Sequence, residues 1–387
     1  MTRVMVSCGE ASGDLYAGAL ADEIHRIEPD ADIFGFGGER LRSAGARLIG
    51  DYRGFSVTGL AEALRVLPRS WRMLRRLEAA AAAERPSVFV AIDFPDFNFR
   101  LASAMRRLGV PVVYYVSPQL WAWRPGRMAT MKRLAARVLV IFPFEAPLYR
   151  DAGVPVEFVG HPLVDLARAS TPRAAFLAEL GLDPGAPTIA LLPGSRRNEL
   201  RAILPRLADA ARLIAGRVPR AQFVVARAPN LDASLFDPVA APVFAGGPPL
   251  AIVEGRADDV IASSDVLVTA SGTATVQAAL HERPMVIVYR LSPLTYRLGK
   301  PLVRVDTYGM VNLVAGRRIV TELIQDDFTP GAVADETVRL LTDEAKAREM
   351  RGALREVRET LGAPGASRRA AEAVLRVARE AGTSREG

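Results

Sequence analysis

The sequence predicts an α/β protein of two doubly wound domains, each with a parallel sheet, and three observations lead to this prediction. Short apolar runs alternate along the chain with longer segments of helical spacing, which is typical of βαβ units. The runs form two successive series, one for each domain. The chain has 387 residues, of which 50% are hydrophobic and 24% charged, so it can bury two ordinary globular cores.

Most of the apolar runs have the length and the flanking Gly, Pro or Asp of buried parallel strands. The first series comprises residues 4–8, 32–36, 88–92, 112–116, 138–141 and 157–159. The second series comprises residues 188–192, 222–226, 250–253, 266–269 and 285–289. A polar stretch, residues 165–172, separates them, so we expect an N-terminal domain of residues 1–168 and a C-terminal domain of residues 169–335.

The last part of the chain, residues 336–387, is predicted to form C-terminal helices. Two of its segments are rich in Ala, Arg and Glu with helical spacing, and Gly362 and Gly365 separate them. A final helix often returns to the first domain in two-domain α/β proteins. We therefore expect packing on that domain or on a partner subunit.

The composition excludes several classes of protein. One cysteine, Cys8, rules out a disulfide framework and a multi-cysteine metal site, and three scattered histidines argue against zinc. P-loop, dinucleotide-binding and nucleophile-elbow motifs do not occur in the sequence. The net charge of +7 leaves three partner classes, which are nucleic acid, an anionic membrane surface and anionic small substrates.

No signal peptide and no uncharged apolar stretch of ~18 residues is visible, so we expect a cytosolic chain without a membrane-spanning helix. One amphipathic stretch, residues 57–76, has the pattern of a helix that lies on anionic lipid. Its candidate membrane contacts are Leu64, Leu67, Arg69, Trp71, Arg72, Leu74 and Arg75. A surface helix whose apolar stripe faces the core explains the pattern as well.

Residues 9–14, Gly-Glu-Ala-Ser-Gly-Asp, join the first predicted strand to a helix, at the edge where open α/β sheets bind ligands. The glycines allow a ligand to approach closely, and Glu10 would repel phosphate but accept hydrogen bonds from sugar hydroxyls. A tight turn capped by Asp14 is the structural alternative.

Residues 91–98 follow another strand and contain Asp93, Asp96 and Asn98. A carboxylate among apolar neighbours can have a raised pKa and act as a general base. Capping of the next helix accounts for one of the three side chains. It accounts less well for Asp93, which lies shortly before Pro95 and is therefore expected in extended backbone.

A predicted loop after a further strand, residues 116–124, carries Ser117, Trp121 and Trp123. Indole rings cover large areas and suit sugar rings or acyl chains, so we expect substrate contacts here. A purely structural tryptophan cluster is the alternative.

Two turns of the second series combine small residues with the start of a helix. They are Gly194, Ser195 and Arg196 after one strand, and Ser271, Gly272 and Thr273 after another. Amides at helix N-termini, together with a guanidinium group, bind pyrophosphate without a metal. Two such turns in one domain predict a nucleotide diphosphate site.

Seven motifs, in this order along the chain, resemble those of lipid-A-disaccharide synthases. They are residues 9–14, 92–98, 115–124, 142–145, 191–196, 270–274 and 312–317. The resemblance implies two Rossmann-like domains of the type B glycosyltransferase fold. It also implies an inverting, metal-independent hexosyltransferase with no cofactor.

The implied reaction joins UDP-2,3-diacylglucosamine to 2,3-diacylglucosamine 1-phosphate (lipid X) and releases UDP and the lipid A disaccharide 1-phosphate. The family works at the inner face of the cytoplasmic membrane. The implied partners are therefore the two lipid substrates and the inner-membrane surface, without nucleic acid and with a homodimer left open.

The resemblance also assigns roles to individual residues. Asp93 is implied to be the base that deprotonates the acceptor's primary hydroxyl, with Glu10 and Asn98 beside it. Arg196 is implied to hold the donor diphosphate. The further implied substrate contacts are Ser12, Ser117, Trp121, Trp123, Gly194, Ser195, Ser271, Gly272, Thr273, Gln277 and Asn312.

One of these positions departs from the family, because Gln277 stands where relatives usually have a glutamate that binds ribose hydroxyls. An amide donates and accepts but loses charge-assisted hydrogen bonds, so UDP binding is weaker or another group takes the role. The alternative functions are another UDP-sugar enzyme of the same fold, such as an epimerase or a peptidoglycan-type glycosyltransferase, and a non-catalytic anion-binding protein.

Overall fold

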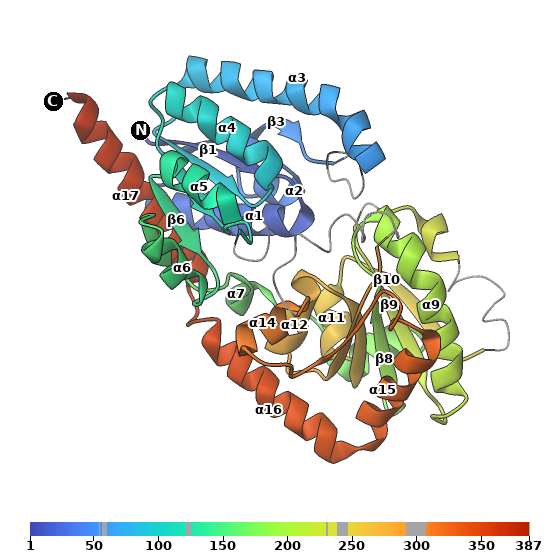
Figure 1. The fold of residues 1–387 in the computed structure, drawn as a ribbon. Helices are drawn as coiled ribbons and strands as arrows, with labels where there is room; N and C mark the ends of the chain where they lie inside the picture. Colours follow the sequence, from blue (N-terminus) through green and yellow to red (C-terminus); the bar gives the residue numbers. More distant parts are fainter. Residues whose placement is uncertain are drawn as a thin grey trace. The chain divides into compact units, whose positions relative to one another are not determined.

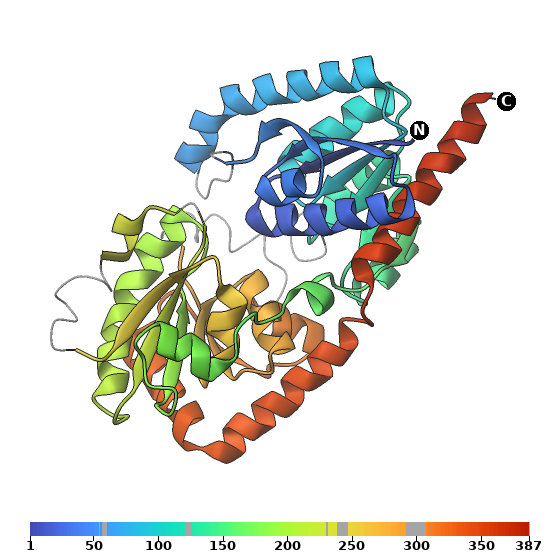
Figure 2. The same ribbon diagram turned by 180° about the vertical axis from the view of Figure 1, so that it is seen from behind.

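The computed structural model describes residues 1–53, 55, 60–120, 125–229, 231–237, 247–291 and 307–386. They form two compact units, each built around its own parallel sheet (Figure 1 and Figure 2). The first unit comprises residues 1–162 together with the chain from Leu361 onward, and the second comprises the described residues between them. The chain passes from one unit to the other between Pro162 and Leu163.

The sheet of the first unit has seven parallel strands in the order β3-β2-β1-β4-β5-β6-β7. They are β1 (Arg3–Cys8), β2 (Asp32–Gly37), β3 (Arg47–Asp51), β4 (Val88–Ile92), β5 (Val112–Tyr115), β6 (Arg137–Val140) and β7 (Val156–Phe158). The chain runs outward from β1 to β3 and then returns to the other side of β1. The topological switch point, where open α/β sheets bind ligands, therefore lies between β1 and β4.

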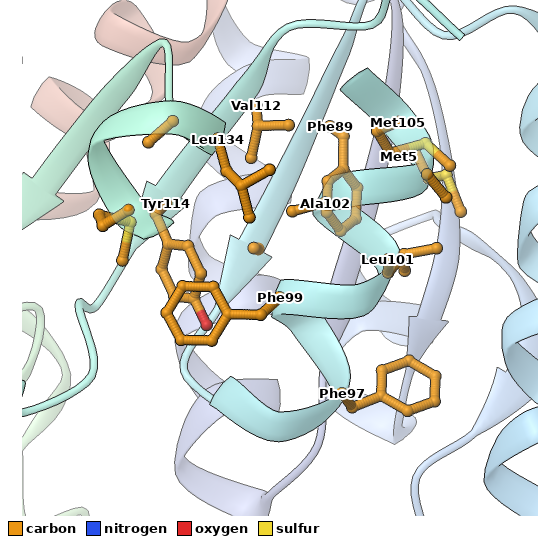
Figure 3. Packing of buried hydrophobic residues seen from close by; sticks show 14 of the residues in the cluster. Met5, Phe89, Phe97, Phe99, Leu101, Ala102, Met105, Val112, Tyr114 and Leu134 are labelled. Atoms are coloured by element: carbon orange, nitrogen blue, oxygen red, sulfur yellow. The ribbon is translucent and has the colours of Figure 1, made fainter. Parts of the chain in front are cut away.

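Helices cover both faces of this sheet. One face packs against α3 (Leu60–Glu84), α4 (Pro95–Arg107), α5 (Met128–Leu134) and α6 (Glu145–Asp151), and α1 (Ala11–Ile27) and α17 (Ala366–Glu386) lie on the other. Figure 3 shows the α4 side, where Phe99 packs beside Tyr114 and Leu101 lies near Met5. The short elements α2 (Glu39–Ser43) and η1 (Pro125–Arg127) complete the unit.

The two C-terminal helices belong to different units. The first, α16 (Glu344–Thr360), packs within the second unit, whereas α17 lies along α1 in the first. Arg379 of α17 forms an ion pair with Glu28 at 2.6 Å, and Arg369 donates a hydrogen bond to the Val159 carbonyl at 2.8 Å. The last helix is therefore a structural part of the unit that begins the chain.

The second unit contains a six-stranded parallel sheet in the order β10-β9-β8-β11-β12-β13. Its strands are β8 (Thr188–Leu192), β9 (Gln222–Arg227), β10 (Leu250–Glu254), β11 (Val266–Ala270), β12 (Met285–Tyr289) and β13 (Thr321–Ile324). The order reverses between β8 and β11, so the switch point of this sheet lies there. The prediction of two doubly wound parallel sheets is thus confirmed.

In the second unit, as in the first, helices connect successive strands of the sheet. They are α7 (Leu163–Leu166), α8 (Arg173–Glu179), α9 (Arg197–Ala215), η2 (Ala233–Phe236), α11 (Ala257–Ala262), α12 (Thr273–Leu280), α14 (Met310–Ala315) and α15 (Pro330–Thr342), followed by α16. Helix α9 packs beside α15, and α12 packs beside α11, α14 and α16. Both expected phosphate-binding turns precede helices of this set, α9 and α12.

Asp14 ties the first turn of α1 to its surroundings. Its carboxylate, in a residue only 2% exposed, accepts hydrogen bonds from the backbone amides of Gly38 (2.7 Å), Arg40 (2.9 Å) and Leu41 (3.2 Å). These amides belong to the start of α2, so Asp14 caps a different helix from the one it lies in. The structural alternative, in which Asp14 caps the turn of residues 9–14, is therefore wrong in its choice of helix.

His161 is a buried titratable residue near the end of residues 1–162, the N-terminal segment of the first unit. It is 2% exposed, and its ring centroid lies 5.3 Å from that of Phe142 and 6.0 Å from that of Tyr16, to which the ring is nearly perpendicular. Burial disfavours the imidazolium and lowers the pKa of His161 to about 3. The folded protein therefore keeps this ring neutral.

The stability of the protein should depend on pH through His161. Unfolding restores an ordinary pKa of about 6.5, so the stabilisation is complete above that pH and is lost as pH falls toward 3. Between pH 7 and pH 5 the wild-type free energy of unfolding should fall by about 2 kcal/mol relative to His161→Gln. Urea unfolding of both proteins at the two pH values measures this, and an equal difference at both would contradict it.

Candidate functional site

The turn after β4 carries Asp93 in an uncommon backbone conformation. Asp93 (φ 43°) and Phe94 (φ 49°) are both left-handed, and Pro95 then begins α4. The expectation of extended backbone at Asp93 is therefore wrong. Left-handed backbone at a non-glycine residue costs on the order of 1–3 kcal/mol of free energy, which contacts with the surrounding structure must offset. The turn leaves the Asp93 side chain half-buried at the switch point of the sheet.

Asn98 holds this turn in place. Its Nδ2 donates to the carbonyl oxygens of Asp93 (2.8 Å), Ile92 (3.2 Å) and Ser7 (3.2 Å), and its Oδ1 accepts from the Ser7 hydroxyl (2.7 Å). The side chain is fully buried, and its hydrogen bonds fix the position of the turn. The catalytic role implied for Asn98 stays a prediction.

Tyr114 on β5 adds a second hydrogen bond to the Asp93 backbone. Its hydroxyl donates to the Asp93 carbonyl at 2.9 Å. Burial, and next the Asp93 charge, raise the pKa of Tyr114, so the phenol remains a neutral donor. Nothing in the sequence indicated this residue, because the contact joins two separate strand ends.

The turn of residues 9–14 lies against the Asp93 turn. A Cβ at Gly9 would lie 2.2 Å from the Phe94 ring, so only glycine allows the ring to pack there. Glu10 is the N-cap residue of α1, and Glu10 and Ser12 are both half-buried. The structure therefore brings Glu10, Ser12 and Asp93 to neighbouring strand ends. Asp96, by contrast, has a 68% exposed side chain that pairs with Arg127.

The loop after β5 carries three of the predicted substrate contacts. Ser117 is 6% exposed, and its hydroxyl is hydrogen-bonded to the hydroxyl of Tyr149 inside the core. Its substrate contact stays a prediction. Trp121 and Trp123 lie outside the described residues.

The turn between β8 and α9 contains Gly194, Ser195 and Arg196. Gly194 has a φ of 109°, which favours glycine, and Arg196 is the N-cap residue of α9. The Ser195 amide donates to Oε2 of Glu199 at 3.3 Å, and Arg196 Nη1 lies 3.1 Å from Oε1 of the same carboxylate. Glu199 thus joins this turn, although no role was predicted for it.

The turn between β11 and α12 is open. Gly272 has a φ of 153°, and a Cβ there would have no atom within 4 Å, so there is room for a ligand beside the helix start. Ser271 and Thr273 are half-buried, and the Ser271 hydroxyl donates to the Tyr308 carbonyl at 2.7 Å. Because β8 and β11 are neighbours, the structure brings the two turns to adjacent strand ends.

Gln277 is oriented by an acidic neighbour. Its Nε2 lies 3.2 Å from both carboxylate oxygens of Asp258, and His281 Nε2 lies 3.0 Å from Oδ1 of that residue. A carboxylate only accepts hydrogen bonds, so Nε2 faces Asp258 and the Gln277 oxygen faces elsewhere as an acceptor. A glutamate at this position would meet the Asp258 charge. The amide therefore matches its surroundings.

Asn312 is a buried residue of α14 whose side-chain amide binds protein groups. It is 1% exposed, its Nδ2 donates to Glu322 Oε1 (2.7 Å) and the Val320 carbonyl (2.9 Å), and its Oδ1 accepts from the amides of Ile319 and Val320. Glu322 in turn accepts from the Gly309 amide at 2.9 Å. These bonds hold the start of α14, and the substrate contact implied for Asn312 stays a prediction.

The expected membrane contacts on α3 divide into exposed and buried residues. Leu67 is 38% and Trp71 52% exposed, whereas Leu74 is 6% exposed and belongs to the core, so its expected membrane contact is wrong. The exposed basic side chains on this helix include Arg69, Arg72 and Arg75. The side chain of Leu64 lies outside the described part.

The described residues offer neither a metal-binding cluster nor a helix that could span a membrane. No group of three or more His, Cys, Asp or Glu side chains there is placed to hold a metal ion. In the same part of the chain, every helix is too short or too polar to cross a bilayer.

Comparison with known proteins places the chain among relatives of one kind. A family model described as lipid-A-disaccharide synthetase matches residues 4–377. The lipid-A-disaccharide synthase of Myxococcus xanthus is 44% identical over 373 residues, covering 96% of this chain and 97% of that protein. The synthase of Koribacter versatilis is 43% identical over 383 residues, covering 98% and 99%.

Solved structures with low sequence identity share the fold. A UDP-GlcNAc 2-epimerase from Neisseria meningitidis, bound to UDP-GlcNAc, has a TM-score of 0.71 at 12% identity and covers 97% of this chain and 100% of that chain. The calicheamicin glycosyltransferase has a TM-score of 0.62 at 16% identity, covering 97% and 98%. The architecture is that of type B glycosyltransferases and related epimerases.

Proposed function

The chain belongs to the lipid-A-disaccharide synthase family, and on this premise we propose how its residues carry out the transfer. It is a glycosyltransferase that joins UDP-2,3-diacylglucosamine to 2,3-diacylglucosamine 1-phosphate and forms the lipid A disaccharide 1-phosphate and UDP. The family match favours this activity over an epimerase and over a non-catalytic anion-binding protein.

Asp93 is the general base of this proposal. Its carboxylate takes the proton of the acceptor's primary hydroxyl as the oxygen forms a bond to the donor's anomeric carbon. The bond from that carbon to the UDP oxygen breaks, its electrons pass to the diphosphate, and the configuration inverts. The observation that carries the assignment is a half-buried aspartate at the switch point, whose backbone carbonyl accepts hydrogen bonds from Asn98 and Tyr114.

The remaining groups divide between acceptor and donor. Glu10 and Ser12 lie at the neighbouring strand end and bind the hydroxyls of the acceptor sugar. The Glu10 carboxylate accepts hydrogen bonds from them, and the Ser12 hydroxyl donates or accepts. Arg196, together with the amides at the starts of α9 and α12, takes up the charge that develops on the departing diphosphate. The Gln277 oxygen, oriented by Asp258, accepts from a ribose hydroxyl.

Removal of the Asp93 charge tests the mechanism. Asp93→Asn keeps the shape of the side chain but cannot accept the proton, so turnover should fall by roughly 10²–10⁴ while UDP binding persists. Release of UDP and disaccharide from the two lipid substrates, with EDTA present, is the assay. Asp96→Asn, three residues away on an exposed side chain, is the matched control and should keep wild-type turnover. Wild-type turnover in Asp93→Asn would exclude Asp93 as the base.

The same proposal places the protein on the cytoplasmic face of the inner membrane. Leu67 and Trp71 are exposed apolar side chains on α3, and the exposed Arg69, Arg72 and Arg75 lie on the same helix. Apolar side chains enter the acyl region of a bilayer, and arginines attract anionic headgroups. This combination supports a peripheral contact.

Vesicle binding tests this contact. Leu67→Ser with Trp71→Ser should lower retention on vesicles that contain anionic lipid by about tenfold or more, and wild-type retention should fall with salt. Leu213→Ser, which changes a 41% exposed leucine on α9, is the control and should bind as the wild type does. Equal retention of all three proteins would remove α3 from the membrane contact.

A further inference from the structure

Glu199 already occupies the groups that are proposed to bind the donor diphosphate. Its carboxylate accepts from the Ser195 amide at 3.3 Å through Oε2 and pairs with Arg196 Nη1 at 3.1 Å through Oε1. The residue is only 7% exposed. The same two kinds of donor, a backbone amide at a helix start and a guanidinium group, also bind phosphate.

The glycine of the turn makes room for this carboxylate. A Cβ at Gly194 would lie 2.6 Å from Glu199 Oε2, and the φ of 109° at Gly194 independently favours glycine. The turn therefore fits closely around the carboxylate oxygen. In this structure the anionic group that lies against the glycine is a carboxylate of the protein itself.

We propose that Glu199 is an internal competitor of the donor diphosphate, which lowers the affinity for UDP and speeds its release; this inference rests on the proposed function. A phosphate that takes the Ser195 amide and Arg196 must displace Glu199, because two anions on the same donors repel each other. The free energy of ligand binding is therefore reduced by the contacts that the Glu199 carboxylate loses. The product UDP leaves faster, because the carboxylate returns to the same donors.

Turnover benefits from such a competitor. Tight binding shared by the donor and by the product UDP does not lower the chemical barrier, and it slows release of the product. A charge on the protein that offsets part of the attraction of Arg196 weakens binding of both. Arg196 can then stabilise the charge that develops during bond breaking without retaining UDP afterwards.

A plain helix cap is the other interpretation of Glu199. A glutamate in the first turn of a helix often accepts a hydrogen bond from a nearby backbone amide. The two interpretations differ in their dependence on charge. Glu199→Gln keeps an oxygen that accepts from the Ser195 amide but removes the charge that competes with phosphate.

Calorimetric titration with UDP distinguishes these interpretations. Glu199→Gln should bind UDP about tenfold more tightly than the wild type, with a correspondingly slower dissociation rate by stopped flow. Glu336→Gln is the matched control, because Glu336 forms the same kind of pair with Arg339 on α15 at 2.6 Å. It should leave UDP affinity unchanged.

The outcomes separate this inference from the proposed function. Unchanged or weaker UDP binding by Glu199→Gln, beside normal binding by the wild type, overturns the competitor role alone. A wild-type protein that does not bind UDP overturns both. If Glu199→Gln does not fold, Glu199→Asp replaces it, because its shorter side chain withdraws the charge from the Ser195 amide. Tighter UDP binding by that variant supports the inference, and unchanged binding overturns it.

Discussion

The proposed acceptor side of this molecule depends on one buried side-chain amide, that of Asn98. Asn98 joins the ends of β1 and β4 by hydrogen bonds to Ser7, Ile92 and Asp93, and so fixes the turn on which the proposed base lies. Two successive left-handed residues would not persist without such support. Because the Phe94 ring then packs on Gly9, the same amide also sets the distance between the two turns at the switch point.

In the second unit, acidic side chains accept hydrogen bonds from groups in or just before its helices. Glu199 accepts from the Ser195 amide, Asp258 from the side-chain amide of Gln277, and Glu322 from the Gly309 amide. The donors at this sheet edge are therefore partly neutralised by the protein itself, and the net charge of +7 does not measure their attraction for a phosphate. Such a site can bind an anion that carries more charge than one carboxylate and still release it.

The fold could be predicted because its signals are local. Apolar runs of strand length and small-residue turns lie within a few residues of each other, and they marked eleven of the strands found. The two missed strands, β3 and β13, lie at sheet edges and are only half-buried, so their sequences carry no continuous apolar run. Helix α3 appeared amphipathic, but periodicity alone could not assign Leu74 to the core.

The candidate site was harder to predict, because a polar side chain has the same sequence signal whether it faces a ligand or the backbone. Asn98 was expected to act in catalysis, and Ser117 and Asn312 were expected to contact substrate; all three are buried and hydrogen-bonded to protein groups. One partner of Asn98 is Ser7, 91 residues away, so only tertiary structure reveals this contact. Asp93 and Arg196 stood out in the sequence because charge at a strand end is a stronger signal than an amide or a hydroxyl.

The most direct test of this account is the turnover of a folded Asn98→Ala protein, with thermal unfolding measured beside it. If the buried amide positions Asp93, the turnover number should fall by about 10² or more, while the KM for the UDP-sugar remains that of the wild type. Ser103→Ala, which removes a hydrogen bond to the Phe99 carbonyl on the same helix, should keep its turnover. Near-wild-type turnover in folded Asn98→Ala would contradict the account.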